Sequence, residues 1–184
     1  AVSSLTTGTG DITFDQTGGG AVTFTTVATT TGNVTLTNTG ANLTLGTVTA
    51  GGAGMDVSVT TSTSGNIIVG SVTAADDVTM SSAGTIIDNA SDTVTDITGD
   101  LLTLTTASGV GESAGNGSLD TAAATLDVSV TGAGLINLNE ADAVTLSDID
   151  TATGPITITT GGATTVTDVE STTDADANDI SITA

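Results

Sequence analysis

The chain has 184 residues, and its 37% apolar content is enough to fill one core, although only 1% of the residues are aromatic. It contains no Lys, Arg or His against 21 Asp and Glu, which gives a formal net charge of −21. Contacts with the phosphates of nucleic acids or with anionic lipids need basic side chains, so this composition excludes both kinds of partner. No Cys is present, which excludes disulfides and thiolate metal sites. No apolar run approaches the roughly 18 residues of a membrane-spanning segment, so we expect no membrane insertion.

A triplet of an apolar, a hydroxyl and a second apolar residue recurs from one end of the chain to the other. The triplets start about 21 to 28 residues apart, which is the range of solenoid repeats. Because side chains alternate along a strand, we expect the outer two residues to face a core and the hydroxyl to face outward. The eight triplets are Ile12–Phe14, Val34–Leu36, Val57–Val59, Val78–Met80, Leu102–Leu104, Val128–Val130, Ile156–Ile158 and Ile180–Ile182.

The first half of the chain repeats a plan of two short strands per turn, after a polar lead-in over Ala1–Gly10. The residues between successive strands are too few for a crossover helix, which excludes a βαβ sheet and favours a parallel coil. We therefore predict an all-β parallel β-helix, right-handed, with about eight turns of roughly 22–26 residues. One solenoid segment spans 1–184, and we expect it to be part of a longer repetitive rod. The strand pairs of the first half are 12–14 with 22–24, 34–36 with 43–45, 56–59 with 67–69, and 78–80 with 86–87.

The second half is less regular. Two acidic segments, Asp88–Asp100 and Gly109–Asp120, are predicted as loops inserted into the coil. The segment Leu119–Leu126 contains three consecutive alanines and favours one helical turn, because Ala has the highest helix propensity. Further strands are expected at Leu135–Leu138, Val144–Leu146 and Val166–Val169, followed by an acidic turn at Asp174–Asp179.

The residue that precedes each triplet is often acidic, and a parallel coil would stack these residues in a column about one strand spacing apart. One interpretation is that their side chains hydrogen-bond to the backbone where each strand begins. The other is that Ca²⁺ binds near Asp56, Asp76 and Asp77, because hard cations prefer carboxylate oxygens. Ca²⁺ is the one cofactor that the sequence suggests. The preceding residues are Asp11, Asn33, Asp56, Asp77, Leu101, Asp127, Pro155 and Asp179.

Catalytic chemistry has little support in the sequence, and we do not expect an enzyme. Nucleophilic triads need a His or another base beside the nucleophile, and none is present. The adjacent carboxylates Asp76 and Asp77 resemble the acid pair of β-helical glycosidases, which cleave between two acids. Those enzymes also use His and basic residues, so a carbohydrate-active β-helix is the less favoured alternative.

Five segments are distinctive, namely Gly84–Asp88, Asp96–Thr105, Gly109–Gly111, Leu119–Thr121 and Asn139–Asp142. They resemble the repeat regions of very large filamentous-haemagglutinin-like surface proteins of bacteria. The resemblance implies a secreted β-helical shaft in adhesion, extracellular matrix or surface-layer roles. We therefore expect an extracellular structural shaft at the cell surface, with a calcium-dependent module for binding glycans or matrix as the alternative.

The two ends of the chain show no capping element in the sequence. Ala1–Gly10 and Asp179–Ala184 are as strand-like and polar as the interior. Solenoids whose terminal strand edges are uncovered tend to associate. The expected partners are therefore adjoining repeats or further copies of the chain, end to end, together with surface glycans.

Overall fold

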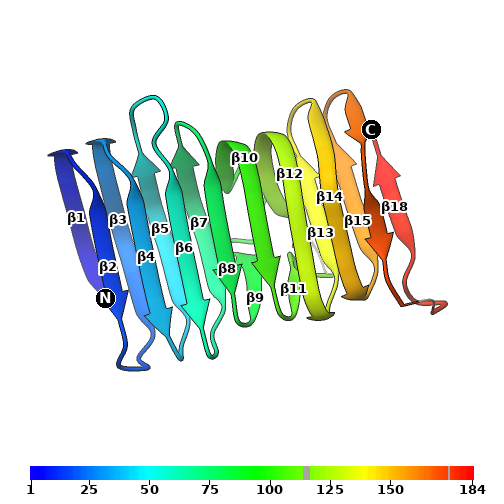
Figure 1. The fold of residues 1–184 in the computed structure, drawn as a ribbon, viewed down its shortest axis with the longest axis horizontal. Helices are drawn as coiled ribbons and strands as arrows, with labels where there is room; N and C mark the ends of the chain where they lie inside the picture. The colour runs from blue at the N-terminus through cyan, green and yellow to red at the C-terminus, as the bar shows by residue number, and fades with distance from the viewer. Residues whose placement is uncertain (114–116, 174) are drawn as a thin grey trace.

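The computed structural model describes residues 1–113, 117–173 and 175–184, and it confirms an all-β parallel β-solenoid of about eight turns. The chain winds from one end of the coil to the other, so that sequence order and spatial order agree (Figure 1). All of the strand pairs are parallel and join strands of successive turns. Within the described residues no helix is long and apolar enough to cross a membrane.

The described residues form 18 strands, which belong to one sheet. They are β1 (Val2–Thr9), β2 (Ile12–Gln16), β3 (Val22–Thr31), β4 (Val34–Thr39), β5 (Leu43–Ala50), β6 (Val57–Ser62), β7 (Ile67–Ala74), β8 (Val78–Ser82), β9 (Thr85–Asp88), β10 (Ile97–Thr106), β11 (Gly109–Val110), β12 (Leu119–Ala133), β13 (Ile136–Glu140), β14 (Val144–Thr153), β15 (Ile156–Thr160), β16 (Thr164–Val166), β17 (Val169–Ser171) and β18 (Ile180–Thr183).

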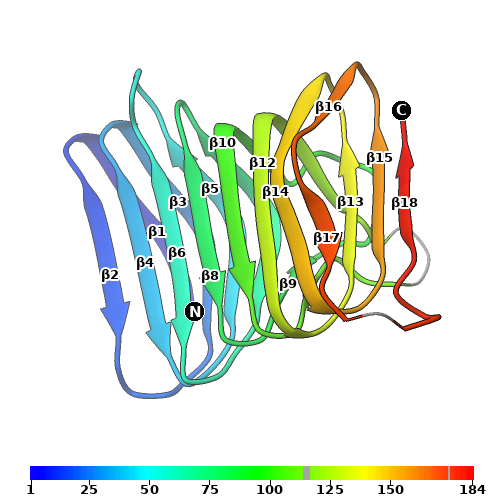
Figure 2. The same cartoon turned by 45° about the vertical axis from the view of Figure 1, so that its right-hand side comes forward.

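One wall of the coil, which we call the first column, consists of β2, β4, β6, β8, the parts of β10, β12 and β14 that pair after them, and β16 and β17. The register shifts by one residue between β12 and β14, after Leu126. Figure 2 shows β2, β4, β6 and β8 side by side along this wall. The predicted alternation is confirmed here. The apolar members Val34, Leu36, Val57, Val59, Val78 and Met80 are fully buried, whereas Thr35 and Ser58 are half-buried and Thr79 is exposed.

The second column contains β1, β3, β5, β7, β9, β11, β13, β15 and β18. Two of the eight triplets, Ile156–Ile158 and Ile180–Ile182, lie here rather than in the first column. A third triplet is displaced along its strand, because Leu104 pairs with Val128. The same alternation serves both walls, and the spacing between triplets therefore could not distinguish one wall from the other.

The structure corrects three further expectations. The lead-in Ala1–Gly10 is mostly strand β1, paired with β3. The predicted helical turn at Leu119–Leu126 is wrong, since the segment lies in β12 between strands of neighbouring turns. Pairing on both sides satisfies its backbone and outweighs the helix propensity of alanine. Part of each predicted inserted loop is also strand, because β10 begins at Ile97 and β11 occupies Gly109–Val110.

The core is a continuous stack of aliphatic side chains, as the low aromatic content required. Its two aromatic rings, Phe14 and Phe24, meet edge to face at the first turn with centroids 5.0 Å apart. Of the predicted acidic turn, Asp174 lies outside the described residues. After it, the Asn178 amide donates to the Ala175 carbonyl at 3.0 Å, which closes a turn before β18.

Candidate functional site

A row of side chains runs along the corner where the first-column strands begin. We call Asp11, Asn33, Asp56 and Asp77 the corner ladder, because each side chain bonds to the backbone of the next turn. The Asp11 Oδ1 accepts from the amide of Asn33 at 2.8 Å, and the Asn33 Oδ1 accepts from Asp56 at 2.9 Å. The Asp56 Oδ1 accepts from Asp77 at 3.2 Å, and the Asp77 Oδ1 accepts from Leu101 at 3.1 Å.

These hydrogen bonds agree with the interpretation that the side chains before the triplets bond to the backbone where each strand begins. The bonds join successive turns, so the side chains extend the backbone ladder beyond the ends of the strands. The predicted column of eight residues is nevertheless too long. Asp127 pairs with Thr103 and not with the Leu101 position, and Pro155 and Asp179 lie next to second-column strands.

The three predicted metal ligands, Asp56, Asp76 and Asp77, do come together. One carboxylate oxygen of each lies within 4.8 Å of the others. The negative charge of Asp77 raises the pKa of Asp76, with smaller contributions from burial and from Asp56 and Asp100. Asp56 is exposed, and Asp76 and Asp77 are half-buried. This exposed acid cluster has the oxygen ligands that a hard cation prefers, although two of its oxygens already accept backbone hydrogen bonds.

A second group of acids, which the sequence analysis did not predict, lies inside the coil. We call Asp88, Asp96 and Asp120 the buried acid cluster. Their exposed fractions are 7%, 3% and 2%, and one carboxylate oxygen of each lies within 4.8 Å of the others. Burial raises the pKa of Asp96 to about 7, although the backbone amide of Asp120 opposes the shift. Burial also raises the pKa of Asp120.

The cluster forms because three strands reach one place in the coil. Asp88 ends β9, Asp96 immediately precedes β10, and Asp120 is the second residue of β12. Ile97 pairs with Thr121, which places Asp96 beside Asp120 in the next turn. The sequence analysis assigned these acids to two separate loops. Their positions next to apolar strand segments were the available signal for burial.

Glu140 is a further buried acid, and its hydrogen bonds account for it. Its carboxylate accepts from the Thr121 hydroxyl at 2.7 Å, from the Ala123 amide at 3.1 Å and from the Asp142 amide at 3.2 Å. Three donors compensate the loss of water around the carboxylate. Glu140 therefore has a structural role in joining β13 to β12.

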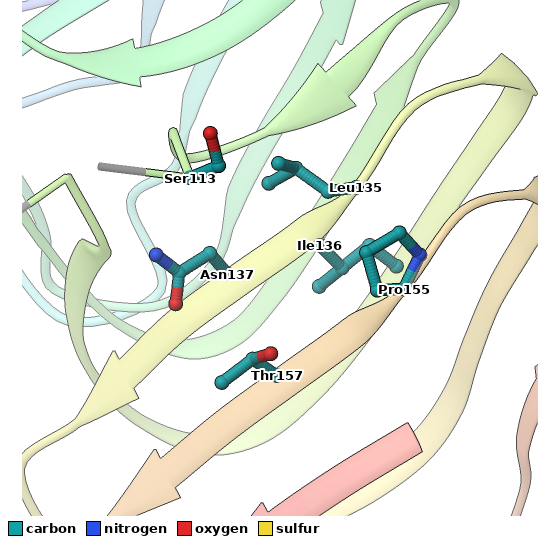
Figure 3. A pocket seen from close by; sticks show the side chains of 6 residues that line it. All are labelled: Ser113, Leu135, Ile136, Asn137, Pro155 and Thr157. Atoms are coloured by element: carbon teal, nitrogen blue, oxygen red, sulfur yellow. The ribbon is translucent and has the colours of Figure 1, made fainter. Parts of the chain in front are cut away.

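Shallow hollows lie on the part of the surface that the structure describes. One, of about 190 Å³, lies between β13 and β15, and Figure 3 shows its side chains. None of them is ionisable, so this hollow offers no acid or base for catalysis. A wider hollow of about 340 Å³ carries Asp100 and Asp142 among small residues near the start of β10 and β12. The residues that line the first hollow are Ser113, Leu135, Ile136, Asn137, Pro155 and Thr157.

In comparisons with protein-family models, curated proteins and solved structures, nothing matches this chain. The class of protein is therefore defined by the fold itself, a parallel β-solenoid with acids along one corner and inside the coil.

Proposed function

We propose that the chain is the structural shaft of a secreted bacterial surface filament or adhesin of the filamentous-haemagglutinin-like kind, acting in attachment or in an extracellular matrix. The observation that supports this most strongly is the in-register stack of the first column, which continues from β2 to β17 over one core. The turns repeat parallel backbone pairing with their neighbours, and the register shifts only locally between β12 and β14. Such a coil can be lengthened by adding turns, without a new kind of contact.

The composition agrees with an extracellular role as a spacer. The chain has no Lys or Arg, so trypsin-like proteases find no cleavage site in it. The outward hydroxyls of the first column form a regular face, which includes Thr35, Ser58 and Thr79. We propose this face as the contact for surface glycans or for neighbouring shafts.

The terminal turns provide the second supporting observation. Among the described strands, β1 pairs with β3 alone and β18 pairs with β15 alone. The outer edge of a terminal strand has backbone donors and acceptors that no neighbouring strand pairs. In the last strand, β18, the side chain of Ile180 is 46% exposed. We propose that these edges add further β-solenoid turns, from adjoining repeats or from another copy of the chain.

An assembly experiment tests this proposal. We expect the unchanged chain to form end-to-end assemblies at high concentration in 0.5 M NaCl, and we expect Ile180→Asp, which places a charge on the terminal strand β18, to shorten them. The reason is that a second strand would have to bury this charge. Thr79→Asp, which adds the same charge to an exposed mid-coil position, is the matched control. Sedimentation velocity and negative-stain images give the assembly length. A chain that stays monomeric, or equal shortening by both variants, would contradict the assembly of copies.

A calcium-dependent module for binding glycans or matrix is the second candidate, and the convergence of Asp56, Asp76 and Asp77 favours it. Glycan binding that requires Ca²⁺ and is lost in Asp77→Asn would support this candidate. Binding unchanged by a chelator would count against it. A carbohydrate-active enzyme is the third and least favoured hypothesis.

A further inference from the structure

We propose that the buried acid cluster, Asp88, Asp96 and Asp120, binds a divalent hard cation, with Ca²⁺ as the best fit. The site would lie inside the coil, at the point where the chain leaves β9, passes through the loop 89–96 and enters β10. It is separate from the exposed acid cluster and is independent of the shaft function proposed above.

The first argument is the cost of burying these charges. Three carboxylates lie within 4.8 Å of one another, and each is at least nine-tenths buried. A buried charge without a partner is strongly destabilising. In this chain no Lys, Arg or His can supply the compensating charge, since none exists in the sequence. The compensating charge must come from solution, either as a metal ion or as protons.

The second argument is an oxygen that lacks a partner. Asp120 is 2% exposed, and its Oδ2 has no hydrogen-bond partner among the described residues. Its Oδ1 accepts from the Asn139 amide nitrogen at 2.5 Å. Buried polar atoms in folded proteins nearly always have a partner, so an oxygen left free on a carboxylate that faces Asp88 and Asp96 indicates a ligand.

The third argument is that surrounding groups already hold the carboxylates in place. Asp88 accepts from the amides of Ala90 at 2.7 Å and Asp92 at 3.0 Å. The Asp96 Oδ2 accepts from the amide of Asp120 at 3.0 Å. Hydrogen bonds of this kind orient the ligands of metal sites and reduce the cost of organising them.

The spacing fits calcium. Ca²⁺ binds oxygens at about 2.3–2.6 Å, so two oxygens on one ion can be up to roughly 5 Å apart. The observed limit of 4.8 Å lies within that range. Mg²⁺ binds at about 2.0–2.1 Å and retains several waters, which suits a buried cluster less well. The loop 89–96 follows Asp88 directly and ends at Asp96, so a bound ion would fasten both ends of this loop to β12.

Thermal unfolding followed by circular dichroism tests the proposal, using the full chain after treatment with a chelator. CaCl₂ at a hundredfold excess over Kd should raise the Tm by about 5 to 10 °C beyond NaCl of equal ionic strength. Calorimetric titration with CaCl₂ should show that the unchanged chain binds an ion and that Asp120→Asn does not bind it. The Asn variant keeps an oxygen for Asn139 and removes one buried charge. We therefore expect the metal-free variant to melt at or above the Tm of the unchanged chain, which separates loss of the ion from loss of the fold.

Two matched variants locate the ion. Asp77→Asn removes a charge from the exposed acid cluster, and Asp15→Asn removes one from an exposed position outside both clusters. Both should keep the calcium-dependent rise in Tm. A rise that survives Asp120→Asn, or that only Asp77→Asn abolishes, would overturn the proposal. A chain whose Tm responds equally to CaCl₂ and to matched NaCl would overturn it as well, and would show that protons balance the cluster. A response to MgCl₂ equal to that with CaCl₂ would overturn the preference for calcium.

Discussion

Leu36→Asp should unfold the turns around β4. Leu36 is fully buried, and its neighbours in the first column, Phe14 and Val59, also face the core. An aspartate here would bury a charge in a chain that has no cationic side chain to pair with it. We expect the free energy of unfolding to fall by more than about 4 kcal/mol, a loss that single substitutions cause only when they disrupt the core severely. Loss of the strand signal in far-UV circular dichroism, and a lowered denaturant midpoint, would measure it.

Thr35→Asp is the matched control, one residue away. Thr35 is half-buried on the outer side of the same strand, and the same added charge there can remain in water. We expect the free energy of unfolding to change by no more than about 1 kcal/mol. Leu36→Ala should fall between the two, at about 2 to 5 kcal/mol, because it leaves a cavity but no charge. Equal losses from Leu36→Asp and Thr35→Asp would reject the alternation of inward and outward residues.

Gly65→Ala should also be severe, for reasons of backbone geometry. Gly65 lies between β6 and β7 with φ +115°, a conformation that residues with a Cβ rarely adopt. A Cβ at this position would lie 2.2 Å from the carbonyl oxygen of Ala41, in the turn before, and backbone atoms cannot move aside easily. Strain alone costs about 1–3 kcal/mol, and the clash adds to it. We expect the Tm to fall by roughly 5 to 10 °C.

Gly8→Ala is the corresponding control. Gly8 lies in β1, and an added Cβ would meet nothing within 4 Å. Because Ala is better than Gly in a strand interior, we expect this variant to melt at the same temperature or slightly higher. A fall in Tm at Gly8 as large as that at Gly65 would mean that the contact with Ala41 does not explain the effect of Gly65→Ala.

The sequence was sufficient to predict the class of fold and the inward and outward faces of the first half. Both follow from the alternation around Val34–Leu36 and from connections too short for helices. The faces of the second half were harder to predict, because triplets such as Ile156–Ile158 have the same pattern in either column. A local pattern determines which side chains are buried. The pairing partner depends on the lengths of the turns between strands.

Of the two acid clusters, one was predictable from the sequence and the other was not. The convergence of Asp56, Asp76 and Asp77 was predictable, since these acids precede neighbouring first-column strands in the regular half. The buried acid cluster was not predicted, because it needs Asp88 and Asp120 to meet across a loop and a full turn. Acids are rarely buried, and although the neighbouring apolar segments were a signal for burial, only the pairing of β10 with β12 shows that Asp96 and Asp120 meet.

We propose that these turns form a shaft that can be extended at its ends. The inter-strand register places Ile182 and Val2 at equivalent positions of the second column. Two copies fused so that Ser181 is followed directly by Val2 of the second copy should therefore continue the coil without a break. The same two copies joined by a flexible Gly/Ser linker serve as the control.

Single-particle electron microscopy of the two fusions is the most direct test. For the in-register fusion we predict one straight particle, longer than a single copy by about 40 Å, which corresponds to eight strand spacings of about 4.8 Å. The flexible fusion should show two particles at variable angles. Variable angles in the in-register fusion too would contradict the account of this chain as an extendable shaft.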